Sequence, residues 1–223
     1  MRILSFVICC GFFVGLTQVS QASLVLNEIL ADPSSGQVGD ANNDGTVSSS
    51  EDEFLEFVNV GGDVINISGW SLSDSVRTRH VFLANTWLLP NQAIVVFGGG
   101  QPDLPSIKWQ TATEGSLGLN NTGDTISVFD EYDQLILQMM YDAMAGDNQS
   151  IVLSPELSGS GYALHSQVSS QGNLFSPGTD VDGGLFLVEQ NRDQSNPITI
   201  PEPVLFPLAM GLVGLFRKVI YRG

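Results

Sequence analysis

Cysteine and basic residues are both scarce in this chain of 223 residues. Its 2 cysteines, Cys9 and Cys10, lie in the apolar run that begins the chain, so the remainder can form no disulfide of its own. Only 8 lysines and arginines stand against 24 acidic residues, and the formal net charge is −16. Nucleic-acid binding depends on Lys and Arg displacing counterions from phosphates. We therefore expect no nucleic-acid partner, and the charge favours a cation instead.

The sequence also lacks long segments with apolar residues at helical spacing, and it lacks the common catalytic motifs. Gly-x-Ser-x-Gly, His-Glu-x-x-His and a phosphate-binding glycine loop are all absent. The 2 histidines, His80 and His165, are expected to be strand or surface residues rather than ligands. Paired carboxylates are frequent, but in so acidic a chain a pair says little about acid–base catalysis. We therefore expect no enzyme.

Short apolar runs separated by Gly, Pro, Asn and Asp fill the centre of the chain. They fall at residues 24–30, 53–60, 64–67, 81–83, 87–89, 93–97, 125–129, 135–141, 150–153 and 161–165, while residues 101–117 are expected to form a loop. Runs of this length and spacing are typical of antiparallel strands in a sandwich. The sequence thus predicts an all-β antiparallel sandwich, with Trp70 in its core and with Glu53 and Glu56 facing solvent.

A loop just before residues 53–60 carries oxygen-bearing side chains at regular intervals. Residues 40–51 match the twelve-residue calcium loop, with a glycine at the sixth position and a glutamate at the twelfth. The predicted ligands are Asp40, Asn42, Asp44, the carbonyl of Thr46, Ser48 directly or through water, and Glu51. Asp52 is an alternative to Glu51, and a plain acidic turn is an alternative to a metal site. The loop resembles dockerin and EF-hand loops, but strands flank it, so we expect a structural Ca²⁺ ion.

The first residues have the features of a secretory signal. Arg2 precedes an apolar run at residues 3–16, and Ser20-Gln21-Ala22 offers small residues for cleavage after Ala22. An uncleaved membrane anchor is the alternative, but the apolar run is too short to span a bilayer as a helix. We predict that residues 1–22 are removed.

The end of the chain joins three elements in a fixed order. Pro201, Glu202 and Pro203 precede an apolar run at residues 204–216, which is followed by Arg217 and Lys218. This resembles the PEP-CTERM sorting signal of Gram-negative bacteria, which implies processing by a membrane-bound exosortase and delivery to the cell surface. We expect the apolar run to form a C-terminal hydrophobic helix with its basic end in the cytoplasm. The alternative to sorting is a permanent single-span anchor, for which the run is short. Both place the body of the protein outside the inner membrane.

Several segments together carry a family resemblance. LVLNEILADP, DEFLEFVNVGGDVINISGWSLSD, NTGDTISVFDEYDQLI, QSIVLSP and SPGTD resemble a secreted bacterial lamin-tail domain over about residues 24–180. The resemblance implies an immunoglobulin-like β-sandwich that binds or supports other molecules without catalysis. The predicted plan is a signal peptide at 1–22, the sandwich at 23–182, a linker at 183–200 and the sorting segment at 201–223.

Taken together, these patterns lead to one expected function and one alternative. We expect a calcium-stabilised, surface-sorted module of the extracellular matrix, with extracellular polysaccharide or surface proteins as candidate partners. The alternative is an extracellular hydrolase that acts on polymers, or the accessory domain of one. Only a recognisable set of catalytic residues would favour the hydrolase.

Overall fold

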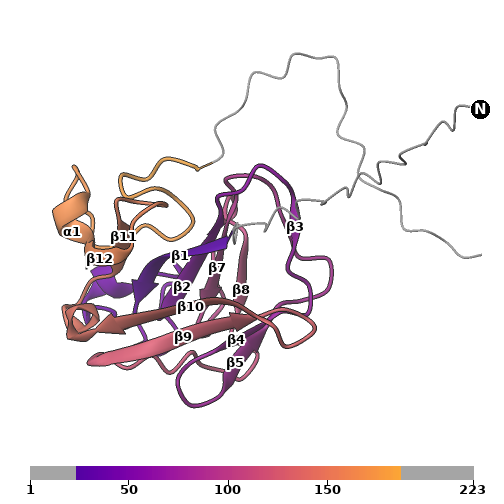
Figure 1. Cartoon of the computed structure of the whole chain (residues 1–223). Coiled ribbons are helices and arrows are strands. Elements are labelled where there is room, and N and C mark those ends of the chain that lie inside the picture. Colours follow the sequence, from indigo (N-terminus) through magenta and orange to yellow (C-terminus); the bar gives the residue numbers. More distant parts are fainter. Residues whose placement is uncertain (1–23, 187–223) are drawn as a thin grey trace, which may run out of the picture. The chain divides into compact units, whose positions relative to one another are not determined.

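The larger of two packed sheets forms one side of the protein (Figure 1). The computed structural model describes residues 24–186. The order of the 6-stranded sheet is β12-β11-β1-β2-β7-β8. Its pairs are antiparallel except for β7 with β8. The strands are β1 (Leu24–Leu30), β2 (Phe54–Asn59), β7 (Ala93–Phe97), β8 (Trp109–Thr111), β11 (Ile151–Ser154) and β12 (Gly161–Leu164).

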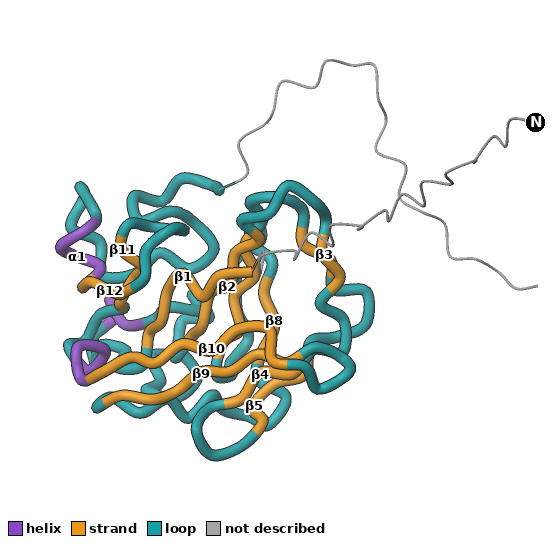
Figure 2. Tube along the Cα trace, in the orientation of Figure 1, coloured by secondary structure: helices purple, strands orange, loops and turns teal. Residues whose placement is uncertain are grey.

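A 4-stranded sheet in the order β10-β9-β4-β5 packs against it. Its strands are β4 (Ser71–Ser73), β5 (Thr78–Val81), β9 (Gly123–Phe129) and β10 (Leu135–Asp142). A small ladder joins β3 (Ile65–Asn66) to β6 (Trp87–Leu88). Strands and loops dominate in Figure 2, with short helices η1 (Gln37–Gly39), η2 (Ala143–Gly146) and α1 (His165–Val168). The predicted all-β, immunoglobulin-like sandwich is confirmed.

The main core lies between the two sheets and follows the alternation of the strands. Leu24 and Leu26 from β1, Leu72 from β4 and Val128 from β9 all point into it. Phe57 meets Phe82 edge to face, with ring centroids 6.1 Å apart. Burying one such aromatic side chain stabilises the fold by roughly 1.5–3 kcal/mol.

A second, smaller core covers the other face of the larger sheet. The rings of Phe54 and Phe97 pack edge to face with centroids 5.7 Å apart. Phe175, which follows α1 in the chain, packs on Phe54 with ring centroids 6.5 Å apart. Leu104 and Ile107 also pack against this cluster. The larger sheet is therefore covered on both faces near β2, and every residue of β2 is buried.

Several expectations about individual residues were wrong. Glu53 and Glu56 are buried and do not face solvent: Glu56 lies on the covered outer face of β2, and Glu53, just before β2, accepts from the Leu119 N–H. His80 is a strand residue of β5, as expected, whereas the buried His165 begins α1. Trp70 packs against the main core but is only partly buried, and its indole N–H donates to Glu131. The expected loop at residues 101–117 contains β8, which extends the sheet in parallel with β7.

Both predicted sorting segments lie outside the described residues. These are the signal peptide at 1–22 and the segment 201–223 with Pro201, Glu202 and Pro203, together with most of the linker at 183–200. Among residues 24–186, no helix has the length and apolar character needed to cross a membrane.

Candidate functional site

The first half of the acidic loop curls around the side chains of its own first residues. Asp40 accepts N–H bonds from Asp44 at 3.2 Å and from Gly45 at 3.0 Å, one on each carboxylate oxygen. Asn42 Oδ1 accepts from the Asp44 N–H at 3.0 Å. Gly45 has φ +85°, a left-handed conformation that glycine adopts at little cost. The predicted sharp turn at the sixth position is therefore present.

The second half of the loop is closed by Asp52, one position beyond the predicted Glu51. Asp52 is fully buried, and its Oδ1 accepts from the N–H groups of Ala41 at 2.9 Å and Asn42 at 3.1 Å. Its Oδ2 accepts from the Ser48 N–H at 2.7 Å. Burial raises the pKa of Asp52, and these three donors oppose that shift. Asp52 thus joins both halves of the loop.

Glu51 occupies a different position from Asp52. Its N–H donates to Ser48 Oγ at 3.2 Å. Its side chain lies against Gly99, where an added β-carbon would stand 3.0 Å from Glu51 Cγ. With Asp44 and Thr46 it lines an open depression of about 540 Å³. Asp103, which is not among the ligands predicted from the sequence, lines the same depression.

The glycine tract at residues 98–100 packs directly against the acidic loop. A β-carbon on Gly98 would stand 1.8 Å from the Ser50 carbonyl oxygen. Gly100 has φ +75°, and a β-carbon there would stand 2.4 Å from Asn42 Nδ2 and 2.6 Å from Asp44 Oδ2. Only glycine allows so close an approach. The sequence indicates no more than a turn at this tract, because nothing local reveals its contact with residues 42–50.

Asp44 connects the acidic loop to the segment after the glycine tract. Its Oδ2 accepts from the Gln101 N–H at 3.0 Å, and its Oδ1 accepts from the Thr46 N–H at 2.8 Å. The donor from Gln101 is the largest of the influences that lower the pKa of Asp44. The carboxylate is therefore held ionised at the junction of two loops.

All six predicted metal ligands lie in this one loop and offer oxygen donors, but only Asp44, Thr46 and Glu51 among them line the open depression. Each carboxylate oxygen of Asp40 and Asp44 accepts one N–H bond, and a carboxylate oxygen has a second lone pair to offer. Hard cations such as Ca²⁺ prefer such oxygen donors. Within residues 24–186, no group of three or more His, Cys, Asp or Glu side chains is grouped closely enough to hold a metal alone. A cation here would depend on Asn42 and on the Thr46 carbonyl as well.

A second polar cluster lies on the covered outer face of the larger sheet. The pairing of β1 with β2 shifts between Leu26 and Glu28, which marks a β-bulge at Asn27. A bulge places two successive residues on one side of a strand. Asn27 and Glu28 consequently share the face of Glu56, and Asn27 Nδ2 donates to Glu56 Oε1 at 2.9 Å.

The Ser176-Pro177-Gly178 turn satisfies both buried carboxyl groups. Ser176 donates its N–H to Glu28 Oε1 and its hydroxyl to Glu28 Oε2, both at 2.9 Å. The Gly178 N–H donates to Glu56 Oε2 at 2.6 Å. Burial raises the pKa of Glu28, and burial together with the neighbouring Glu28 raises that of Glu56 well above its usual range. Glu28 and Glu56 thereby attach residues 176–178 to the larger sheet.

Ser176 and His165 lie close enough to suggest a nucleophile and its base, but their surroundings are those of a structural contact. Ser176 Oγ is 2.8 Å from His165 Nε2, and His165 Nδ1 faces the Asn173 carbonyl at 2.9 Å. Both side chains are buried. A catalytic serine needs access to substrate and a base oriented for proton transfer, and this buried pair offers no such access.

One family comparison bears on identity. The lamin tail domain family matches residues 17–143, more than half of the chain. No curated protein matches the chain. The matched region covers the acidic loop and the smaller sheet, and β11, β12 and the Ser176 turn complete the fold beyond it. Domains of this family are immunoglobulin-like and generally structural or binding modules without catalysis. The chain belongs to the lamin tail domain family.

Proposed function

We propose that the protein is a secreted, surface-sorted module of the extracellular matrix, non-catalytic, and that a calcium ion in the loop at residues 40–52 stabilises it. The observation that carries the calcium proposal is the junction at Asp44. This one carboxylate belongs to the oxygen-rich loop and also binds the backbone after the glycine tract. An ion held by Asp44 would therefore stabilise two loops together.

Electrostatic repulsion supports a cation in this loop. Asp40, Asp44, Glu51 and Asp52 lie within one short segment. A shared ion would hold carboxylates of this loop about 4 Å apart, where two of them without the ion would repel by about 4 kcal/mol at an effective dielectric of ~20. A divalent cation removes this repulsion, and binding to the folded state alone stabilises that state.

The proposed ligands are those expected from the sequence, with one position open between two residues. Asp40, Asn42, Asp44 and the Thr46 carbonyl would supply the first oxygens, and Ser48 would act directly or through water. Either Glu51 or Asp52 would complete the shell. Asp52 already receives three N–H bonds inside the loop, whereas the Glu51 carboxylate faces the open depression. Binding by Glu51 would leave the Asp52 contacts intact.

The proposed location rests on the sequence at the two ends of the chain. The signal at residues 1–22 would direct export, and Pro201-Glu202-Pro203 would be recognised by an exosortase. The alternative function, a hydrolase acting on extracellular polymers or its accessory domain, has no particular observation in its favour. The family is generally non-catalytic, and the pair formed by Ser176 and His165 is buried.

Calorimetry with CaCl₂ on the metal-depleted mature protein tests the calcium proposal. We expect one binding site with a dissociation constant on the order of 10⁻⁶ to 10⁻³ M, the range from sensor to extracellular sites. Asp44→Asn should remove the heat, whereas Asp133→Asn should keep it. Asp133 is an exposed turn residue with φ +61°, a conformation that asparagine also adopts. Equal heats from both variants would contradict the proposal.

Two further variants decide which carboxylate completes the shell. Glu51→Gln should weaken binding without unfolding the loop if Glu51 is a ligand, because its side chain lies outside the Asp52 contacts. Asp52→Asn should reduce stability even without calcium, because one of the two buried oxygens that accept these N–H bonds becomes an NH2 group, which cannot accept them. Mass spectrometry of the C-terminal peptide from native cells tests sorting. A surface form that ends at Gly223 would contradict it.

A further inference from the structure

Three rows of outward residues on the 4-stranded sheet carry no formal charge, although the chain as a whole has a net charge of −16. The core side of this sheet holds Leu72, His80, Ile126 and Val128, all buried. Successive residues of a strand point to opposite sides, so the residues between these point outward. The strand register then places the outward residues in three uncharged rows across β5, β4, β9 and β10, and a fourth row pairs Gly123 with the exposed Asp142.

The middle row consists of hydroxyl and amide side chains. Ser73 pairs with Thr78 on one side and with Ser127 on the other, and Ser127 pairs with Gln138. Ser73 Oγ donates to Thr78 Oγ1 at 3.2 Å, and Gln138 Nε2 donates to Ser127 Oγ at 3.1 Å. Hydroxyl and amide oxygens can each accept further bonds. Ser127 is only 7% exposed, so the accessible hydrogen-bonding groups of this row are those of Ser73, Thr78 and Gln138.

The two flanking rows are mostly apolar. One row runs through Val81, Ser71, Phe129 and Leu135, and the other pairs Thr125 with Met140. Val81 is 42% exposed, Leu135 53% and Met140 75%. We call the three rows together the neutral face. With strands about 4.8 Å apart and rows about 6.8 Å apart, its residues span roughly 14 Å in each direction.

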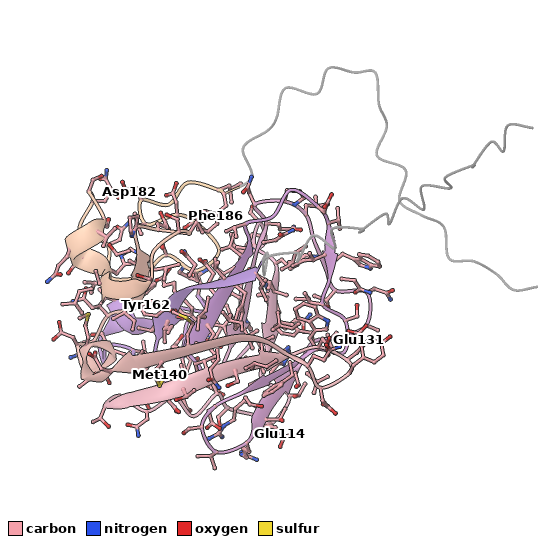
Figure 3. All side chains as sticks on the ribbon, viewed as in Figure 1. Glu114, Glu131, Met140, Tyr162, Asp182 and Phe186 are labelled. Atoms are coloured by element: carbon pink, nitrogen blue, oxygen red, sulfur yellow. The ribbon has the colours of Figure 1, made fainter. Side chains whose placement is uncertain are left out.

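Acidic residues surround the neutral face without entering it. Asp130 and Glu131 lie in the turn between β9 and β10, and Asp142 ends β10. Glu114 lies beyond β5, where it pairs with Arg77. Figure 3 shows Met140 on β10, with Glu131 and Glu114 beside the strands of the same sheet. The Debye length is about 8 Å at physiological ionic strength, so these charges act over much of the face.

We propose that the neutral face binds an uncharged polysaccharide, an inference that rests on the proposed role as a matrix-binding module. An anionic polymer would be repelled by the acidic border. A second copy of this chain would bring the same acidic border against it. A neutral sugar chain is not repelled, and its hydroxyl groups and C–H surfaces match the hydroxyl row and the apolar rows. The face supplies no positive charge that would favour a phosphate, sulfate or carboxylate ligand.

Affinity electrophoresis of the mature protein tests this proposal, with cellulose derivatives and dextran as neutral polymers and alginate as the anionic control. We expect at least one neutral polymer to retard the protein and alginate not to. Gln138→Glu places a charge in the middle row and should weaken retardation at least tenfold. Gln171→Glu makes the same chemical change at an exposed site of the C-terminal segment and should leave retardation unchanged.

Several outcomes would overturn the proposal. Retardation by alginate alone or by no polymer would do so, as would equal retardation of the two variants. Loss of binding in Trp109→Ala but not in Gln138→Glu would instead place the site at the edge strand β8. Sedimentation that reveals a dimer separated by Gln138→Glu would make the face an interface between copies. Calcium calorimetry on the same preparation tests the loop at residues 40–52 and does not involve the neutral face. A preparation that binds calcium but no neutral polymer would therefore contradict the polysaccharide proposal and leave the calcium proposal intact.

Discussion

Glu53 should make the stability of the fold depend on pH between about 4.5 and 7. The residue is 6% exposed, and its carboxyl group accepts from the Leu119 N–H at 3.3 Å. Burial raises its pKa from 4.5 to about 7, although two backbone donors and Arg79 oppose the shift. Between these two pH values, the folded state keeps a proton that the unfolded state has lost. Stability therefore falls as pH rises through this window and does not fall further above it.

The size of the effect follows from the shift. A difference of about 2.5 pKa units at about 1.36 kcal/mol each gives roughly 3 kcal/mol. Glu53→Gln cannot ionise, yet its amide oxygen can still accept from Leu119. We expect the variant and the wild type to have similar free energies of unfolding at pH 4. At pH 8 the variant should be the more stable of the two by up to about 3 kcal/mol.

Urea unfolding at pH 4, 6 and 8 measures this difference. Other buried acids with raised pKa values, such as Glu28 and Glu56, affect both proteins equally and cancel in the comparison. Glu114→Gln is the matched control, because it makes the same chemical change at a side chain that is 49% exposed. A difference between Glu53→Gln and the wild type that stays constant from pH 4 to pH 8 would refute the reasoning.

Three further changes test other contacts. Gly100→Ala should cost more than about 1 kcal/mol in thermal unfolding, because Gly100 has a positive φ and lies against Asp44. Gly36→Ala should cost less, because no atom lies closer than 3.9 Å to the added β-carbon. Equal losses of stability in the two variants would contradict the close approach at Gly100. Trp70→Ala should cost about 2 kcal/mol in urea unfolding, less than the roughly 3–5 kcal/mol expected for a fully buried aromatic. A larger loss would mean that the ring is buried. Ser176→Ala should cost about 1–3 kcal/mol by removing a buried hydroxyl donor to Glu28, and unchanged stability would show that this contact contributes nothing.

The prediction of a sandwich succeeded because its signals are local. Short apolar runs at 24–30 and 135–141, and turn residues such as Asp130 and Asp133, specify strands and hairpins without reference to the rest of the chain. β8 was missed because residues 109–111 are a short parallel edge strand, whose pairing with β7 depends on the folded sheet. Periodicity carries little information about so short an element.

Glu56 was wrongly expected to face solvent because alternation specifies which side of a strand a residue occupies, not whether that side is covered. Residues 104–107 and 175–178 cover the outer face of β2, so a position that alternation assigns to solvent is buried. The bulge at Asn27 adds to this, since it brings Glu28 to the same side. Neither feature is visible in the spacing of the residues themselves.

The sequence by itself determined the turn at Gly45 and the spacing of the oxygen-bearing side chains in residues 40–51, since both are properties of one short segment. The tertiary structure alone decided that Asp52 closes this loop, that Gly100 packs on Asp44 and that Gly178 donates to Glu56. The physical reason is the distance along the chain. Contacts between residues 44 and 100, or 56 and 178, depend on how two sheets pack, and no local pattern encodes that packing.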